Sequence, residues 1–187
     1  MLYPDPPVML LDVDGVLNAW GPYPGASKRK PRFNALWDCV MGRGVAACGN
    51  REWTIKWAPP LIPRLLALYE SGAAEIRWAT TWAGDTADLE RLLGLPAFPT
   101  AFDATGQHWT KVSQLKRRAA AHVQDVEGRR LVWVDDNEVP HHWELAHAAM
   151  SDERTLLVRP KEALGLLPTD MDRIEQFCGF AYEEANA

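Results

Sequence analysis

The sequence feature that most constrains the fold is a pair of short apolar runs that each end directly at acidic residues. The first run is Val8–Leu11, followed by Asp12, and the second is Leu131–Val134, followed by Asp135 and Asp136. A short, continuous apolar run is typical of a strand that is buried on both faces, as in parallel sheets. Since ligands of open α/β sheets bind beyond the carboxyl ends of the strands, we expect these acids to lie together at one edge of a parallel sheet.

Between and after these runs, the hydrophobic periodicity predicts helices and strands in alternation. Helices are expected at residues 61–69, 85–93, 111–126, 138–150 and 169–177, and further strands at residues 75–80 and 155–158. Gly94 and Pro96 stop the second of these helices. The alternation indicates an α/β fold with a doubly wound, mainly parallel sheet.

Residues 18–58 interrupt this alternation. They are rich in Gly and Pro, carry the basic cluster Lys-Arg-Lys-Pro-Arg at 28–32, and include Trp20, Trp37, Trp53 and Trp57. We interpret this stretch as a small insert after the first strand that acts as a flap or minimal cap over the strand's end, with a hairpin near residues 52–57. The basic cluster is most often a solvated loop, but in this position it would contact the rest of an anionic substrate bound at the strand's end.

Composition limits the remaining choices. A chain of 187 residues with 47% hydrophobic and 24% charged residues fits a single domain, 1–187, that contains the insert. No apolar run approaches the roughly 20 residues of a membrane helix, and the first residues do not resemble a signal peptide, so we expect a cytoplasmic protein without membrane contact. The net charge of −5 argues against binding to long duplex nucleic acid, but not against a small phosphorylated substrate in a local pocket.

Residues 10–18 read Leu-Leu-Asp-Val-Asp-Gly-Val-Leu-Asn, which resembles the first motif of the haloacid dehalogenase superfamily of phosphohydrolases. The resemblance implies a Rossmann-like core and makes Asp12 the nucleophile that forms an aspartyl-phosphate. It makes Asp14 the acid that protonates the leaving oxygen and then activates water, and Gly15 the sharp turn beside the phosphate. The alternative is a pair of loop carboxylates or part of a calcium loop, although a calcium loop requires a third ligand before its glycine.

Residues 75–82 read Glu-Ile-Arg-Trp-Ala-Thr-Thr-Trp and are similar to the superfamily's second motif, a strand ending in a residue that binds a phosphoryl oxygen. The resemblance assigns this contact to Thr80 and a second contact to Thr81. Arg77 fits poorly in a central strand, and β-branched threonines suit strands without any substrate. Both interpretations of the threonines stay open.

Lys111 is expected in the first turn of a helix that Thr110 caps. A cation there opposes the helix dipole by about 0.3–1 kcal/mol, which suggests an anion nearby. The superfamily's third motif is a lysine at such a position, so the resemblance makes Lys111 the residue that balances the charge of the nucleophile and the phosphoryl group. The alternative is a solvated surface lysine, which is how we interpret Lys116, Arg117 and Arg118.

Residues 131–138 match the fourth motif, a buried strand that ends in paired acids. The resemblance implies that Asp135, Asp12 and the main-chain carbonyl of Asp14 bind Mg²⁺, with Asp136 orienting its waters or sharing the ligation. The alternative is that one acid caps the following helix, which would leave the second acid unexplained.

Together the four motifs predict a Mg²⁺-dependent phosphatase that hydrolyses a phosphomonoester. The strings at 12–18 and 80–82 also look similar to a subgroup, the haloacid-dehalogenase-like domains of RNA repair proteins, which implies a nucleotide or a nucleic-acid end as substrate. Two alternatives remain: a non-catalytic phosphate-binding or regulatory domain with the same fold, and a phosphotransferase.

Overall fold

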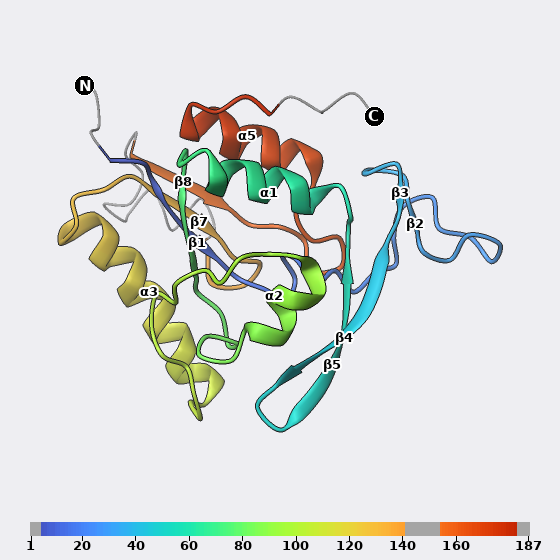
Figure 1. Cartoon of the computed structure of the whole chain (residues 1–187), viewed down its shortest axis with the longest axis horizontal. Coiled ribbons are helices and arrows are strands. Elements are labelled where there is room, and N and C mark those ends of the chain that lie inside the picture. Colours follow the sequence, from blue (N-terminus) through green and yellow to red (C-terminus); the bar gives the residue numbers. More distant parts are fainter. Residues whose placement is uncertain (1–4, 141–153, 183–187) are drawn as a thin grey trace.

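The computed structural model describes residues 5–140 and 154–182, and its centre is a four-stranded parallel sheet (Figure 1). The strand order is β6-β1-β7-β8, with bounds Glu75–Trp78, Val8–Leu11, Leu131–Val134 and Thr155–Val158. Leu11 is in register with Trp78 on one side and with Val134 on the other. The predicted parallel sheet is therefore confirmed, and the residues that follow β6, β1 and β7 emerge at the same edge.

Helices cover both faces of this sheet, which explains why its central strands are apolar at every position. On one face, Met9 and Leu11 of β1 belong to a core shared with α1 (Leu61–Glu70) and α5 (Pro168–Cys178). On the other face, Val8 and Leu10 pack in a second core with α3 (Trp109–Asp125), as the layers in Figure 1 show. Among the described residues, none of the helices is both long enough and apolar enough to cross a membrane.

Most predicted element bounds agree with the structure to within two residues. The strands at Val8–Leu11, Leu131–Val134 and Thr155–Val158 have the predicted limits, and α2 (Ala87–Leu93) ends at Gly94 in the left-handed conformation. The prediction that Thr110 caps the next helix is wrong, because α3 begins at Trp109 and His108 is its N-cap. The helix predicted at 138–150 lies mostly outside the described residues.

Arg77 is tolerated in β6 because that strand lies at the end of the four-stranded order. Its guanidinium binds both carboxylate oxygens of Glu127 at 2.6 and 2.9 Å and Glu75 at 2.7 Å. These pairs raise the pKa of Arg77 above its ordinary value, against the opposing effect of burial. The polar residue that fits a central strand poorly is thus accommodated by ion pairs at the margin of the sheet.

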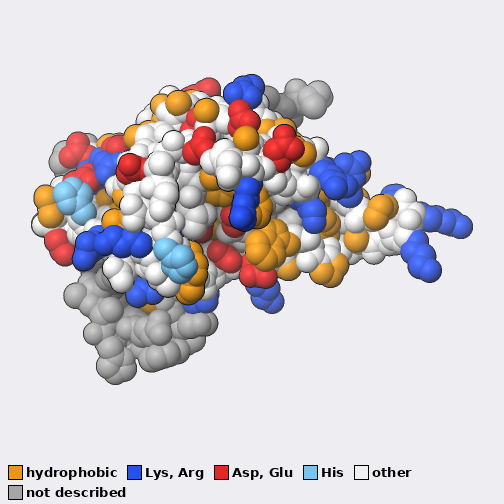
Figure 2. All heavy atoms as spheres, turned by 90° about the horizontal axis from the view of Figure 1, so that it is seen from below, with side chains coloured by type: hydrophobic (Ala, Val, Ile, Leu, Met, Phe, Trp, Pro, Cys, Tyr) orange, Lys and Arg blue, Asp and Glu red, His pale blue; other side chains and the backbone are white. Residues whose placement is uncertain are grey.

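The insert forms two antiparallel strand pairs, β2 (Phe33–Asn34) with β3 (Cys39–Val40), and β4 (Gly42–Cys48) with β5 (Arg51–Trp57). A hairpin was predicted near residues 52–57. The hairpin is β4–β5, and residues 52–57 belong to its second strand alone. Its β4 strand packs on α2, where the Ala47 N–H donates to Asp88 at 3.3 Å. The insert projects to the right in Figure 1, and Figure 2 shows basic side chains gathered at its far end.

Candidate active site

A cavity of about 260 Å³ lies at the carboxyl edge of the sheet, beyond the ends of β1 and β7. Most of the residues that line it are polar or charged, among them carboxylates, one lysine and one threonine, and two tryptophans are also present. These residues include Asp12, Asp14, Asp136, Lys116, Thr81, Trp20 and Trp109. The edge at which the sequence predicted converging acids is therefore hollow and carries acids from two different strands.

Asp12 is the first residue after β1 and is 6% exposed. Its Oδ1 accepts the N–H of Val13 at 2.7 Å, and its Oδ2 accepts from Lys116 Nζ at 2.5 Å. Burial raises the pKa of Asp12 to about 7, and the neighbouring Asp135 carboxylate adds to the increase while Lys116 opposes it. Both oxygens of the carboxylate are thus held by hydrogen-bond donors, and further positive charge nearby would stabilise its ionised form.

Lys116 connects the two acidic strand ends. Its ammonium binds Asp12 and, at 2.7 Å, Asp135, which is fully buried. Burial alone would lower the pKa of Lys116, but these two carboxylates outweigh burial and raise the pKa above its ordinary value. The other Asp135 oxygen accepts the N–H groups of Asn137 and Glu138. Lys116 is therefore a buried cation whose charge is balanced within the site.

The structure corrects the prediction that Lys111 is the site lysine and Lys116 a solvated one. Lys111 is exposed and does not line the carboxylate cavity, whereas Lys116 is 5% exposed. A helix turns about 100° per residue, so five residues place the two lysines about 140° apart around α3. Arg117 and Arg118 are exposed as predicted. Within the described residues, the lysine that faces the predicted nucleophile is Lys116.

A signal for Lys116 was present in the sequence. The buried residues of α3 are Val112, Lys116, Ala120 and Val123, at the i, i+4, i+8 and i+11 spacing of one helix face. A lysine within an apolar stripe has to find a buried partner. Lys111 lies outside this stripe. The position of Lys116 in the apolar stripe, rather than the distance of a lysine from the start of the helix, indicates which lysine faces the site.

Three carboxylates form a group that fits a divalent cation. One oxygen each from Asp12, Asp135 and Asp136 lies within 4.8 Å of the others. Octahedral Mg²⁺ with bonds of about 2.1 Å holds its ligand oxygens about 3–4 Å apart. The three side chains would therefore have to move only slightly toward one another to bind the ion. Burial, and then the charge of Asp135, raise the pKa of Asp136 to about 6. Three acids near one lysine leave negative charge for a cation to balance, and all the donors are the hard oxygens that Mg²⁺ prefers.

Asp14 is separate from that group and is held by two donors. Its Oδ1 accepts from Asn18 Nδ2 at 2.9 Å, and its Oδ2 accepts from Trp82 Nε1 at 3.0 Å. Asn18 also accepts the N–H of Lys56 from β5 at 2.9 Å. The side chain of Asp14 is thus fixed in the cavity by the strand-end turn and by the insert. Sequence reasoning had given Asn18 and Trp82 no function, although both lie in the motifs that it examined.

The two threonines after β6 differ in position. Thr80 is fully buried, and a hydrogen bond from its side chain lowers the pKa of Asp12 in part, which places the hydroxyl beside that carboxylate. Thr81 is exposed and lines the cavity. The structure therefore brings Thr80 to the predicted nucleophile and Thr81 to the space where a ligand would lie.

Gly15 occupies a backbone conformation that other residues adopt at a cost. Its φ is +72°, and a Cβ at this position would lie 2.4 Å from the Asp136 side chain. Both the turn and the approach of the second acidic pair therefore require glycine. The prediction of a sharp turn at Gly15 is confirmed.

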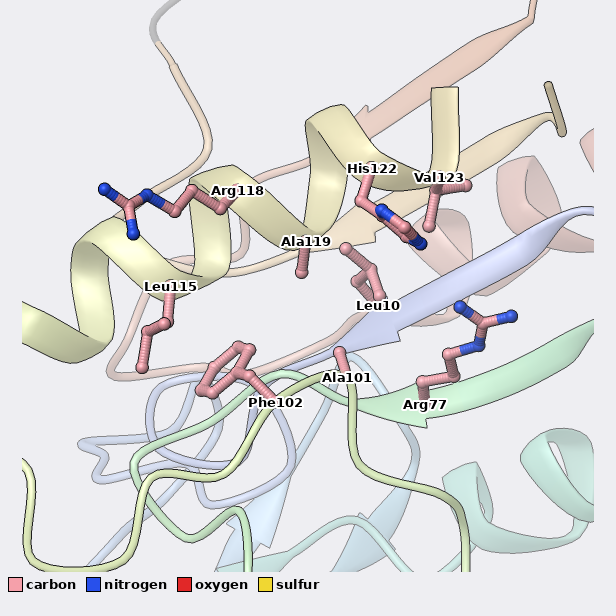
Figure 3. Close-up of a pocket in the computed structure, with 9 residues that line it drawn as sticks. All are labelled: Leu10, Arg77, Ala101, Phe102, Leu115, Arg118, Ala119, His122 and Val123. Atoms are coloured by element: carbon pink, nitrogen blue, oxygen red, sulfur yellow. The ribbon is translucent and has the colours of Figure 1, made fainter. Parts of the chain in front are cut away.

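A second cavity, of about 320 Å³, lies between α3 and the β1–β6 side of the sheet (Figure 3). Arg77, Arg118 and His122 contribute its polar groups, and Leu10 and Phe102 contribute apolar surface. Among the described residues that line it there is no carboxylate. It therefore offers no carboxylate nucleophile and no group of carboxylates for a metal ion, and we assign the chemistry to the carboxylate cavity.

Comparison with known proteins gives one family match. The model of a family described as "HAD domain in Swiss Army Knife RNA repair proteins" matches residues 8–171, which include the four motifs and the insert. Neither a curated protein nor a solved structure matches the chain.

Proposed function

Since the chain belongs to the family of HAD domains in Swiss Army Knife RNA repair proteins, we propose that it is a Mg²⁺-dependent phosphatase acting on a phosphomonoester at a nucleic-acid end. The observation that carries the proposal is that one cavity contains the buried Asp12–Lys116 pair and, separately held, Asp14. A nucleophile and an acid/base group need this kind of arrangement, in which two carboxylates differ in their partners.

In the first step, an Asp12 oxygen attacks phosphorus and the bond from phosphorus to the ester oxygen breaks. Asp14 gives its proton to the departing oxygen, so the leaving group departs as an alcohol. Asn18 and Trp82 hold Asp14 in place, and Thr80 and Thr81 donate hydrogen bonds to phosphoryl oxygens. The product of this step is an aspartyl-phosphate on Asp12.

In the second step, Asp14 takes a proton from water and the resulting hydroxide attacks the same phosphorus. The bond from phosphorus to Asp12 breaks, which releases inorganic phosphate and restores both carboxyl groups to their starting states. Lys116 remains between Asp12 and Asp135 throughout and reduces the repulsion between the nucleophile and the phosphate.

Asp12, Asp135 and Asp136 would hold the Mg²⁺, with the main-chain carbonyl of Asp14 as the further ligand proposed from the family resemblance. When bound, the ion supplies positive charge that offsets the negative charge of the phosphoryl oxygens. The choice of Mg²⁺ is supported by the oxygen-only donor set and by the excess of carboxylates over the one lysine.

The test is phosphate release by purified protein with Mg²⁺ from short RNAs carrying a 3′- or 5′-phosphate, and from the matching mononucleotides. Asp12→Asn should lower the rate at least about a thousandfold, because an amide cannot act as the nucleophile. The matched control is Asp125→Asn, which makes the same change at an exposed residue at the end of α3.

Three outcomes would contradict parts of the proposal. Absence of release from every phosphorylated substrate would favour a phosphate-binding or regulatory domain. Transfer of phosphate to an added alcohol in preference to water would make the chain a phosphotransferase. Unchanged turnover by Asp12→Asn with normal folding would refute the nucleophile assignment while leaving the family membership intact.

A further inference from the structure

Two more cavities continue from the carboxylate cavity along the insert. Trp20 lines both the carboxylate cavity and a neighbouring cavity of about 200 Å³. That second cavity shares Pro31 and Arg32 with a third, of about 430 Å³, at the basic cluster. The three hollows therefore adjoin in series, from the strand ends to the far part of the insert. We call the second and third cavities together the insert channel.

The insert channel is basic, although the chain as a whole carries a net charge of −5. Five cationic side chains line it, and Asp38 is the one carboxylate in its lining among the described residues. The cations are Arg29, Lys30, Arg32, Arg43 and Lys56. A local concentration of one sign of charge, in hollows rather than on a flat surface, attracts an elongated anion.

These cations are also available to a ligand. Within residues 5–140 and 154–182, none of the five forms an ion pair with a carboxylate, whereas Arg64, Arg77 and Arg129 elsewhere all do. Lys56 donates to the Trp20 main-chain oxygen at 3.1 Å, and Lys30 lies 5.3 Å from the Phe33 ring centre. The charge gathered at the end of the insert in Figure 2 is therefore not neutralised by neighbouring acids.

One exposed tryptophan lies where the insert channel meets the carboxylate cavity, and a second lines the carboxylate cavity alone. Trp20 is 52% exposed at that junction, and Trp109, which also lines the carboxylate cavity, is 63% exposed. Large exposed indoles beside a polar cavity offer stacking faces to planar groups. A phosphate-binding pocket, flanking indoles and a row of cations match in order a phosphorylated end, its first bases and the backbone behind them.

The insert is tied to the core by Trp37 and is held together internally by further hydrogen bonds, so the channel is built before a ligand arrives. Trp37 Nε1 donates to the Leu166 main-chain oxygen at 2.9 Å, and Tyr23 OH donates to the Ala19 oxygen at 2.7 Å. Ala19 N in turn donates to Lys56 O at 2.8 Å. Because these donors are buried, little ordering of the insert would oppose binding.

We propose that the insert channel binds the single-stranded RNA segment next to the phosphorylated end, with Trp20 stacking on a base near that end. This inference rests on the proposed function, since it takes the carboxylate cavity as the place of the terminal phosphate. It makes the preferred substrate an RNA of several nucleotides, and the insert a strand-binding element rather than a simple cover.

The first test is binding of 3′- and 5′-phosphorylated, dye-labelled RNAs of one, two, four, eight and twelve nucleotides, measured by fluorescence anisotropy. Asp12→Asn protein is used so that the RNA stays intact. Affinity should rise with length until the channel is filled. If all five cations neutralise phosphates, the salt dependence predicts about 100-fold weaker binding at 200 mM than at 50 mM salt, whereas the mononucleotide should change little.

The second test removes charge from the channel. The double variant Arg32→Gln/Arg43→Gln should lower the slope of log affinity against log salt by about 1.4 for the long RNA, at about 0.7 per phosphate contact. Both side chains are exposed, so folding should be unaffected. The double variant Arg118→Gln/Arg173→Gln removes the same charge from two exposed residues of α3 and α5 that do not line the channel, and this control should leave the slope unchanged.

The results separate this inference from the proposed function. Length-dependent, salt-dependent binding without turnover by the wild-type protein would retain the channel and reject the phosphatase. Equal affinity and equal turnover for the mononucleotide and the twelve-nucleotide RNA would reject the channel and retain the phosphatase. Binding of an acidic peptide of matched charge as tightly as the RNA would also overturn the proposal, because the channel would then recognise charge alone.

Discussion

Replacing Lys116 by methionine tests the central electrostatic feature of the site. Methionine keeps most of the side-chain volume, so the cost of a cavity is small. What is lost is a buried ammonium at 2.5 Å from Asp12 and 2.7 Å from Asp135. Removing one member of a buried ion pair typically costs about 3–5 kcal/mol, because the remaining charge is left without a partner.

We therefore expect Lys116→Met to lower the free energy of unfolding by about 3 kcal/mol at pH 8, at the lower end of that range, because loss of the ammonium raises the pKa of Asp12 further and protonation of Asp12 then relieves part of the unpaired charge. For a chain of this length, that loss corresponds to a decrease in Tm of roughly 6–12 °C. The matched control is Lys111→Met, the same substitution at the exposed lysine in the first turn of α3. It should raise stability by no more than about 1 kcal/mol, since the lysine there opposes the helix dipole.

Urea denaturation followed by tryptophan fluorescence and by circular dichroism, in EDTA, measures both variants. Phosphate release with Mg²⁺ should also fall far more in Lys116→Met than in Lys111→Met. Equal effects of the two substitutions, or a loss below about 1 kcal/mol in Lys116→Met, would show that Lys116 does not balance the buried carboxylates. The activity assay is compared only at temperatures at which both variants remain folded.

Three further changes test individual residues. Gly15→Ala should reduce phosphate release at least about tenfold with the fold retained, because the new methyl would displace an acid of the metal group; normal activity would refute the close packing. Trp82→Phe removes a donor to Asp14 and should lower kcat about tenfold with KM nearly unchanged, whereas a change in KM alone would assign Trp82 to substrate binding. The Arg77 hydrogen bonds hold the pKa of Glu127 below its ordinary value of 4.5, so this pair contributes stability above that pH and loses it as the pH falls further. Glu127→Gln should therefore lose less stability than the wild type between about pH 5 and 3 in urea titrations, and parallel pH profiles would contradict the assignment.

Much of the fold could be predicted because its strongest signals are local. A four-residue run such as Val8–Leu11 is apolar at every position only when both faces are covered, and the cores on its two sides show that they are. The doubly wound sheet follows from strands that alternate with helices. The same runs end in acids, so the place of the candidate site at the carboxyl edge was predictable as well.

Other features depended on long-range packing. Arg77 seemed unsuited to a strand until the sheet order placed β6 at an end and brought Glu127, from 50 positions along the chain, to its guanidinium. The hydrogen-bond donors to Asp14 could not be predicted from the sequence either. Many residues of the chain could donate to a carboxylate in a turn, and only the fold decides which of them lie close enough. Only the folded chain brings Trp82 to Asp14.

By itself, the sequence determined which residues end the buried strands, and hence that Asp12, Asp135 and Asp136 meet at one edge. Tertiary structure decided that Lys116 rather than Lys111 faces them, and that the basic residues of the insert border hollows adjoining the same site. The physical reason is the range of the interactions. Burial of a strand can be predicted from the hydrophobicity of consecutive residues. The partner of a charged side chain depends on which face of a helix points toward the site and on where a loop packs, and both are set by contacts between distant parts of the chain.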